Sequence, residues 1–260
     1  MEPTTIDALK WLAKNFLEKL ADEPKTKLQP KKEIQPTTMD VLRKSTKNFL
    51  RKSANKLKKF RPKTKEELQK LVGDSFKNLG DIDTSLITDM SYLFSNGFLS
   101  RTNFSGIENW DVSNVTDMHG MFYGATNFNQ PLNNWDVSSV TSMGGMFCNA
   151  KSFNQPLNGW DVSNVENMSA MFVGAEKFNQ PLDNWDVSSV ANMEVMFVGA
   201  EKFNQPLDNW DVSSVANMSG MFAGAKKFNQ LLDNWDVSSV TDMSEMFEYS
   251  AQDPLPKWYK

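Results

Sequence analysis

The sequence predicts an α/β repeat solenoid, a right-handed coil with one short parallel strand and one short helix per 25-residue repeat, preceded by an α-helical N-terminal arm. Three observations predict it. Tryptophans that each open a Trp-Asp-Val-Ser segment recur every 25 residues, at Trp110, Trp135, Trp160, Trp185, Trp210 and Trp235. Within a repeat, the apolar spacing changes from that of a strand to that of a helix. Units this short cannot bury an apolar face alone, so neighbouring units must stack.

The arm, residues 1–61, is predicted to be basic and helical with a Pro/Lys-rich linker. Two similar segments, Thr4–Leu17 and Thr37–Leu50, carry apolar residues at helical spacing, and three prolines lie between them in residues 23–36. Residues 1–72 hold 19 Lys/Arg against 9 Asp/Glu, whereas residues 73–260 hold 9 against 23. The formal charges of the two parts are therefore +10 and −14, a basic arm joined to an acidic body.

The strongest run of charge lies in residues 41–65, which contain eleven Lys/Arg and no acidic residue. Such a run is typical of a solvated tail, a helix on an anionic membrane, a phosphate-binding element or a segment that docks into an acidic groove, including one on the same chain. The candidate residues for an anionic partner are Arg43, Lys44, Lys47, Arg51, Lys52, Lys56, Lys58, Lys59 and Arg61.

Each end of the repeat array is expected to carry a cap, because terminal units must shield their apolar faces. Residues 62–103 hold the N-terminal cap and a degenerate repeat, and Thr64 with Glu67 predicts a capping box. The apolar stripe of this capping helix consists of Leu68, Leu71 and Val72. The C-terminal cap is assigned to residues 251–260, through Leu255, Trp258 and Tyr259.

Residues 104–250 form six tandem repeats. In the repeat from Phe128, the alternation of Trp135 and Val137 with polar residues predicts a strand. The spacing of Val140, Met143, Met146 and Phe147 then predicts a short helix. A glycine two residues after the Phe, as at Gly124, Gly174, Gly199 and Gly224, is placed to end that helix in the left-handed conformation. The columns of Met, Phe and Trp are predicted to be core.

The spacing of Leu132, Trp135, Val137 and Val140 matches the leucine-rich-repeat template, with Val at its last position. Over residues 62–250 the chain resembles the BspA-like leucine-rich-repeat surface proteins. The similarity is to the bacterial and mycoplasmal lipoprotein-type branch whose unit reads FNQPLxNWDVSxVxxMxxMF, and strings such as FNQPLDNWDVSSV recur here. The resemblance implies a leucine-rich-repeat-like coil, a place at the cell surface or outside the cell, and binding of partner macromolecules.

Strand alternation sends Trp and Val inward, so the Asp and first Ser of each repeat are expected on an outer face. The aspartates would form a column about 5 Å apart, and the candidates are Asp83, Asp111, Asp136, Asp161, Asp186, Asp211 and Asp236. The serines are Ser113, Ser138, Ser163, Ser188, Ser213 and Ser238. Backbone hydrogen bonds, a basic protein or peptide, or bound calcium could offset the repulsion within this column. Asn134, Asn184, Asn209 and Asn234 are expected to form an internal hydrogen-bond ladder.

Catalysis is not expected. A glycosidase needs two carboxyl groups in unlike surroundings, whereas the seven column aspartates look alike. The single histidine, His119, and single cysteine, Cys148, exclude imidazole metal cages and intramolecular disulfides and are interpreted as a surface residue and a half-buried thiol. We expect no cofactor. The chain shows neither a signal peptide nor a lipobox, which by itself indicates a cytoplasmic protein.

The functional prediction is a non-catalytic scaffold that binds a protein or peptide on the acidic face. The alternative is that the arm anchors the protein to anionic membrane or nucleic acid, with the repeats as a display module.

Overall fold

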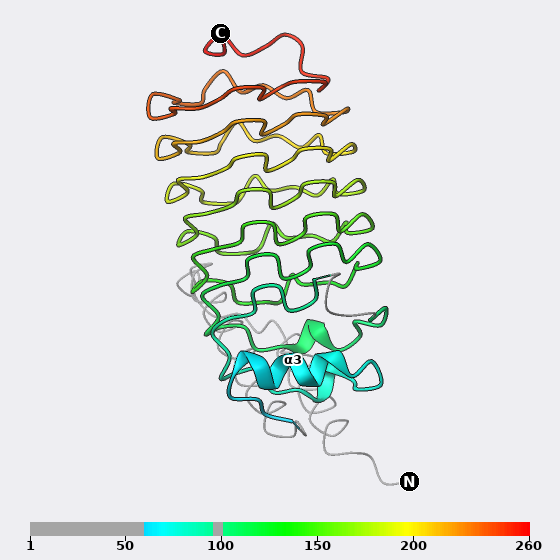
Figure 1. Ribbon diagram of the computed structural model, residues 1–260. Helices are drawn as coiled ribbons and strands as arrows, with labels where there is room; N and C mark the ends of the chain where they lie inside the picture. Colours follow the sequence, from blue (N-terminus) through cyan, green and yellow to red (C-terminus); the bar gives the residue numbers. More distant parts are fainter. Residues whose placement is uncertain (1–59, 96–100) are drawn as a thin grey trace, which may run out of the picture. The chain divides into compact units, whose positions relative to one another are not determined.

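The computed structural model describes residues 60–95 and 101–260, where successive repeats form a stack of similar coils (Figure 1). These residues lie within one unit, residues 58–260. Its helices are α3 (Lys65–Gly73) and the short 3₁₀ helices η1 (Leu79–Asp81) and η2 (Ile107–Asn109). No helix of the described ranges is long and apolar enough to span a bilayer. Of the predicted arm, only Phe60 and Arg61 are described.

Each pair of neighbouring coils is joined by one parallel bridge at the residue before the first repeat methionine. The bridges link Asp89 to Asp117 and then run through Ser142, Asn167, Asn192 and Asn217 to Asp242. The predicted strand at Trp135 and Val137 is not assigned in the structure, so the expected position of the parallel pairing is wrong. The pairing instead uses the polar residue just before each Met-x-x-Met-Phe segment.

The predicted short helix in each repeat is also replaced, in this case by consecutive tight turns. Gly145 and Asn149 have φ of 61° and 57°, and the non-glycine residues Ala170 and Val195 share this left-handed conformation. A left-handed residue breaks an α-helix, because its peptide group no longer points along the helix axis. The glycines predicted to be left-handed, Gly124, Gly174, Gly199 and Gly224, do have positive φ.

These turns align the peptide groups of one coil face. In the coil from Met193, the N–H groups of Met193, Val195, Phe197 and Gly199 donate to carbonyls of the next coil at 2.8–2.9 Å. The pattern recurs from the coil of Met118 to that of Met218. Each coil also donates at least one backbone N–H in the reverse direction, as from Ala216 to the Ala191 carbonyl. One edge of every coil is thus rich in donors and the other in acceptors, unlike a β-strand edge.

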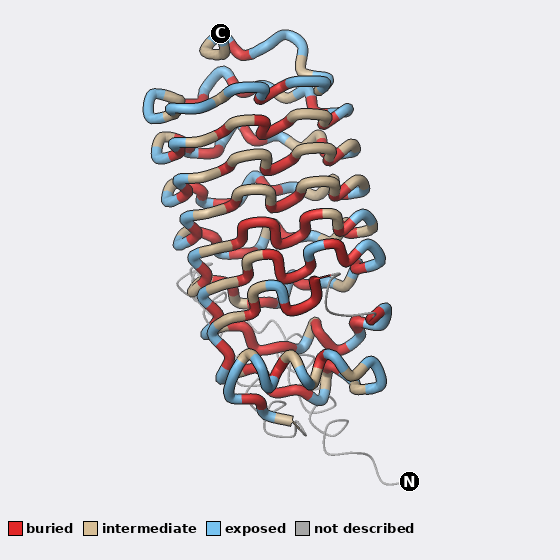
Figure 2. The backbone as a smooth tube through the Cα atoms, viewed as in Figure 1, coloured by how far each residue is buried: buried red, intermediate tan, exposed pale blue. Residues whose placement is uncertain are grey.

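The Met, Phe and Trp columns form the core, as predicted. Buried stretches of chain recur from coil to coil in the stack (Figure 2). Phenylalanine rings from Phe122 to Phe247 stack from coil to coil at centroid distances of 5.5–5.7 Å. Each repeat tryptophan from Trp110 to Trp235 also donates its indole N–H to a carbonyl of the preceding coil; Trp210 Nε1 lies 3.0 Å from the Leu182 oxygen. The coils are therefore joined by buried side chains as well as by backbone.

Helix α3 covers the first coils. The Thr64 hydroxyl accepts from the Glu67 N–H at 3.3 Å, while the Glu67 carboxylate accepts from the N–H of Lys63 rather than that of Thr64. Leu68 and Val72 are fully buried and Leu71 packs partly against the same core.

Arg101 closes the end of this helix. Its guanidinium, almost completely buried, donates to the backbone carbonyls of Val72, Asp74, Lys77 and Asn103.

At the other end, Trp258 continues the tryptophan column, with its ring 6.2 Å from that of Trp235 and its N–H bonded to the Leu232 carbonyl. Tyr259 packs edge-on against Phe247, whereas Leu255 is half exposed. Leu255 therefore does not take the covering role predicted for it.

Candidate functional site

The predicted aspartate column is held by hydrogen bonds to its own serines. In the coils of Asp136, Asp161, Asp186 and Asp211, the Oδ1 atom accepts from both the N–H and the hydroxyl of the serine two residues later. The hydroxyl bonds measure 2.6–2.7 Å. Asp111 accepts both bonds from Ser113 in the same way, whereas Asp83 and Asp236 accept the backbone bond from Ser85 and Ser238. Of the three alternatives, the described contacts are those of the first, an aspartate that caps a local turn.

These bonds favour the ionised carboxylates. Hydrogen bonds from the Ser188 side chain and then its N–H hold the pKa of Asp186 below its usual value, against a smaller opposing effect of the neighbouring Asp211. The same causes lower the pKa of Asp211 and of Asp236. The serine contacts of Asp186, Asp211 and Asp236 all engage Oδ1, so none of them occupies Oδ2.

Exposure of the column changes along the stack. Asp83 and Asp111 are buried, Asp136 is intermediate, and the members from Asp161 to Asp236 are exposed. The prediction that the whole column faces solvent is wrong for the first two positions, which lie at the covered end of the stack. The available acidic surface therefore consists of Asp161, Asp186, Asp211 and Asp236, which we call the exposed column.

Arg61 shows how a cation binds this column. Its Nε atom lies 3.2 Å from Oδ2 of Asp83, the oxygen that Ser85 leaves free. The other arm candidates, Arg43, Lys44, Lys47, Arg51, Lys52, Lys56, Lys58 and Lys59, lie outside the described residues.

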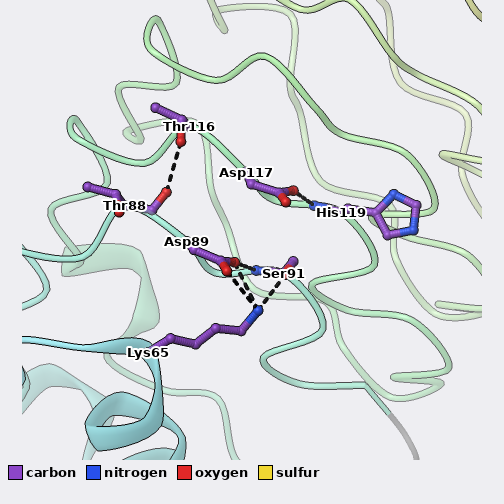
Figure 3. Close-up of polar contacts among 7 residues, drawn as sticks. All are labelled: Lys65, Thr88, Asp89, Ser91, Thr116, Asp117 and His119. Carbon is purple, nitrogen blue, oxygen red and sulfur yellow. Dashed lines mark hydrogen bonds and ion pairs between the residues drawn. The ribbon is translucent and has the colours of Figure 1, made fainter.

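A second polar column, not predicted from the sequence, follows the parallel bridges. Asp89, Asp117, Asn167, Asn192, Asn217 and Asp242 each accept the N–H of the residue two positions later. Figure 3 shows its first members, with Lys65 of α3 reaching Asp89 and Ser91 and with the Thr116 hydroxyl on the Thr88 carbonyl. Burial alone would raise the pKa of Asp89, but the hydrogen bonds from Lys65 and Ser91 lower it. The sequence feature that could have predicted this column is the Asp, Ser or Asn that precedes the first methionine of each repeat.

A third column, of exposed aspartates, was also not predicted from the sequence. Asp183, Asp208 and Asp233 lie three residues before members of the exposed column and are themselves exposed. Asp183 accepts from the Asn158 amide and Asp233 from the Lys257 N–H. Carboxylates are therefore densest in the coils from Asp183 to Asp236.

The internal asparagine ladder was predicted at the wrong asparagine. Asn134, Asn184, Asn209 and Asn234 are exposed. The ladder is made by the Phe-Asn-Gln segment, where the Asn154 oxygen accepts the N–H of Asn179 and the amide of Gln180. Its members are Asn129, Asn154, Asn179 and Asn204, each receiving both bonds from the following coil.

The single histidine and cysteine lie apart from the exposed column. His119 Nε2 is 2.7 Å from the Tyr92 hydroxyl on the surface. Cys148 is buried, and burial raises the pKa of its thiol above the ordinary value, which disfavours the nucleophilic thiolate. In residues 60–95 and 101–260, no three His, Cys, Asp or Glu side chains are grouped to hold a metal ion.

Comparison with known proteins gives one family. The model of the family described as "Mycoplasma protein of unknown function, DUF285" matches three overlapping ranges, residues 64–180, 88–207 and 154–258. Together these ranges take in all the complete repeats. No curated protein and no solved structure matches the chain.

Proposed function

We propose that this chain, which belongs to the DUF285 family of mycoplasma proteins, is a non-catalytic scaffold that binds a basic protein or peptide on its exposed column. Within that proposal, its tandem repeats form a right-handed, leucine-rich-repeat-like solenoid of the BspA-like type. The function of the stack is then to hold carboxylates at a fixed interval for a partner, without chemistry on that partner.

The contact of Arg61 with Asp83 is the observation that carries this proposal. A guanidinium binds Oδ2 of a column aspartate whose Oδ1 accepts a serine N–H. Asp161, Asp186 and Asp211 likewise accept a serine N–H through Oδ1, with a serine hydroxyl bond in addition, and among the described residues no ion pair neutralises them. A partner with Arg or Lys side chains would therefore find several copies of one site.

The repetition itself supports binding over catalysis. Every exposed aspartate accepts the N–H of the serine two residues later, and Asp186, Asp211 and Asp236 share one direction of pKa shift. An acid–base pair requires two carboxyl groups whose surroundings push their pKa values apart. Identical sites instead give multivalent binding, in which individually weak contacts add through high effective concentration.

The proposal is tested with an array of synthetic peptides rich in Arg and Lys, probed with the full chain. We expect Asp186→Asn, Asp211→Asn and Asp236→Asn together to abolish capture of the peptides that the unaltered chain retains. The matched control changes Asp183, Asp208 and Asp233 to Asn, an equal change of charge in the same coils. Equal losses in both triple variants, or no loss in the first, would refute recognition by the exposed column.

A further inference from the structure

The last coil presents a row of backbone donors that no described residue accepts. In every preceding complete coil, four N–H groups bind carbonyls of the following coil. The equivalent groups of the last coil belong to Met243, Glu245, Phe247 and Tyr249, and we call this row the donor edge. Residues 60–95 and 101–260 supply no acceptor to it. Glu245 and Tyr249 have φ of 57° and 54°, so the alternating backbone conformation of the earlier coils continues here.

The chain after Ser250 covers a different half of the coil. Gln252 bonds Gln230, Asp253 bonds Asn229 and Trp258 stacks on Trp235. Trp258 and Tyr259 contact the Phe247 ring, while Tyr249 remains 82% exposed and Met243 is only partly buried.

The polarity of the donor edge restricts what can bind it. Beside the four donors lies one outward-facing acceptor, the backbone carbonyl of Thr241. In the preceding coil, the equivalent carbonyl of Ala216 accepts the N–H of Thr241. Two copies of this edge cannot pair, because donors would face donors. A β-strand presents donors and acceptors alternately, so docking of a strand would leave some of its N–H groups buried and unpaired, which is unfavourable.

A row of backbone carbonyls that would match the donor edge occurs in each repeat of the chain itself. In the last coil these are the carbonyls of Asp242, Ser244, Met246 and Glu248, which accept the four N–H groups of the preceding coil. We call such a row the carbonyl edge. A folded second copy does not offer that edge at its first coil, because Leu68 and Val72 of α3 are buried there and Lys65 binds Asp89 and Ser91. A repeat segment that is not stacked on another coil, and that has the same alternating backbone conformation, does offer a carbonyl edge. Asp242, Glu245 and Glu248 lie in or beside the donor edge and are exposed, which favours a segment that carries cations.

We propose that the donor edge is a docking site for a Met-x-Gly-Met-Phe-x-Gly segment of another repeat chain, bound as an additional half-coil. Its carbonyls accept the four N–H groups, and its first Met side chain covers the partly buried Met243, while Trp258 and Tyr259 keep their contacts with Phe247. The residues 216–227 of this chain, ANMSGMFAGAKK, have this pattern and end in two lysines.

The test uses the full chain and a synthetic peptide of residues 216–227, with hydrogen exchange followed by mass spectrometry. The segment 242–250, whose sequence occurs once in the chain, reports on the donor edge. We expect the peptide to slow exchange of up to four amides in that segment. A control peptide with Gly220→Pro and Gly224→Pro cannot adopt positive φ and should leave exchange unchanged.

Unchanged exchange at the highest soluble peptide concentration would overturn the proposal, as would equal protection by the proline peptide. The variant with Asn at Asp186, Asp211 and Asp236 separates this site from the exposed column. The donor edge predicts the same protection in that variant, so protection that disappears with the three aspartates would assign the peptide to the exposed column and overturn docking at the edge.

Discussion

Replacement of Trp210 by Phe tests how strongly indole groups join the coils. Trp210 is 3% exposed, and its Nε1 donates to the Leu182 carbonyl at 3.0 Å. The Leu182 carbonyl also accepts the backbone N–H of Trp185 at 3.1 Å, so this carbonyl keeps one hydrogen-bond partner in the variant. The cost is then one net hydrogen bond, about 1 kcal/mol, with no orphaned acceptor.

The smaller ring adds a packing loss. Trp210 stacks between Trp185 and Trp235 at 6.4 and 6.5 Å, and removal of buried ring atoms costs about 1–2 kcal/mol at about 0.8 kcal/mol per CH₂-sized group. We therefore expect Trp210→Phe to lower the free energy of unfolding by about 2–3 kcal/mol.

Urea unfolding followed by far-UV circular dichroism measures this change. Trp258→Phe is the matched control, because its indole makes the same bond to Leu232 at the partly buried end of the column. The control should lose less stability than Trp210→Phe. A loss below about 1 kcal/mol at Trp210, or a larger one at Trp258, would refute the view that interior indole bonds join the coils.

Three further predictions concern backbone, charge and the thiol. Gly106→Ala should strongly destabilise the protein in thermal unfolding, because a Cβ there would lie 2.2 Å from the Gly80 nitrogen. The control Gly159→Ala, whose Cβ would have no atom within 4 Å, should change the free energy of unfolding by less than about 0.5 kcal/mol. Equal effects of the two substitutions would contradict the described packing. The pKa values of Asp186, Asp211 and Asp236 are lowered in the folded state, so their contribution to stability is present above the ordinary aspartate pKa and is lost as pH falls through the folded values; acid titration of the triple Asn variant should show a shallower loss, and an unchanged pH profile would count against the serine contacts. Cys148 should react with a thiol reagent far more slowly in the native protein than in urea, and equal rates would contradict its burial and raised pKa.

The repeat period and the core could be predicted because they depend on apolar spacing alone. Met143, Met146 and Phe147 face inward as expected, yet their spacing is shared by a helix and by consecutive tight turns. Glycine marks the left-handed position in some coils, but Ala170, Val195 and Glu245 occupy it in others. Single-residue propensity therefore does not reveal the turns.

The aspartate column could be predicted from the repeat pattern, but the exposure of its individual members could not. The serine contacts of the aspartates follow from local sequence, whereas the burial of Asp83 and Asp111 depends on tertiary packing at the covered end of the stack. The asparagine ladder was assigned to the wrong position, because the return loop contains two asparagines per repeat and only the coil geometry shows which one faces its neighbour.

The most direct test of the proposed scaffold is the dissociation constant of one array-selected basic peptide for chains with one, two or three members of the exposed column changed to Asn. The scaffold predicts that Asp186→Asn, Asp211→Asn and Asp236→Asn each weaken binding by a similar factor, and that the factors multiply as changes are combined. An unchanged dissociation constant in the triple variant, or a loss confined to one aspartate, would contradict recognition by a repeated column.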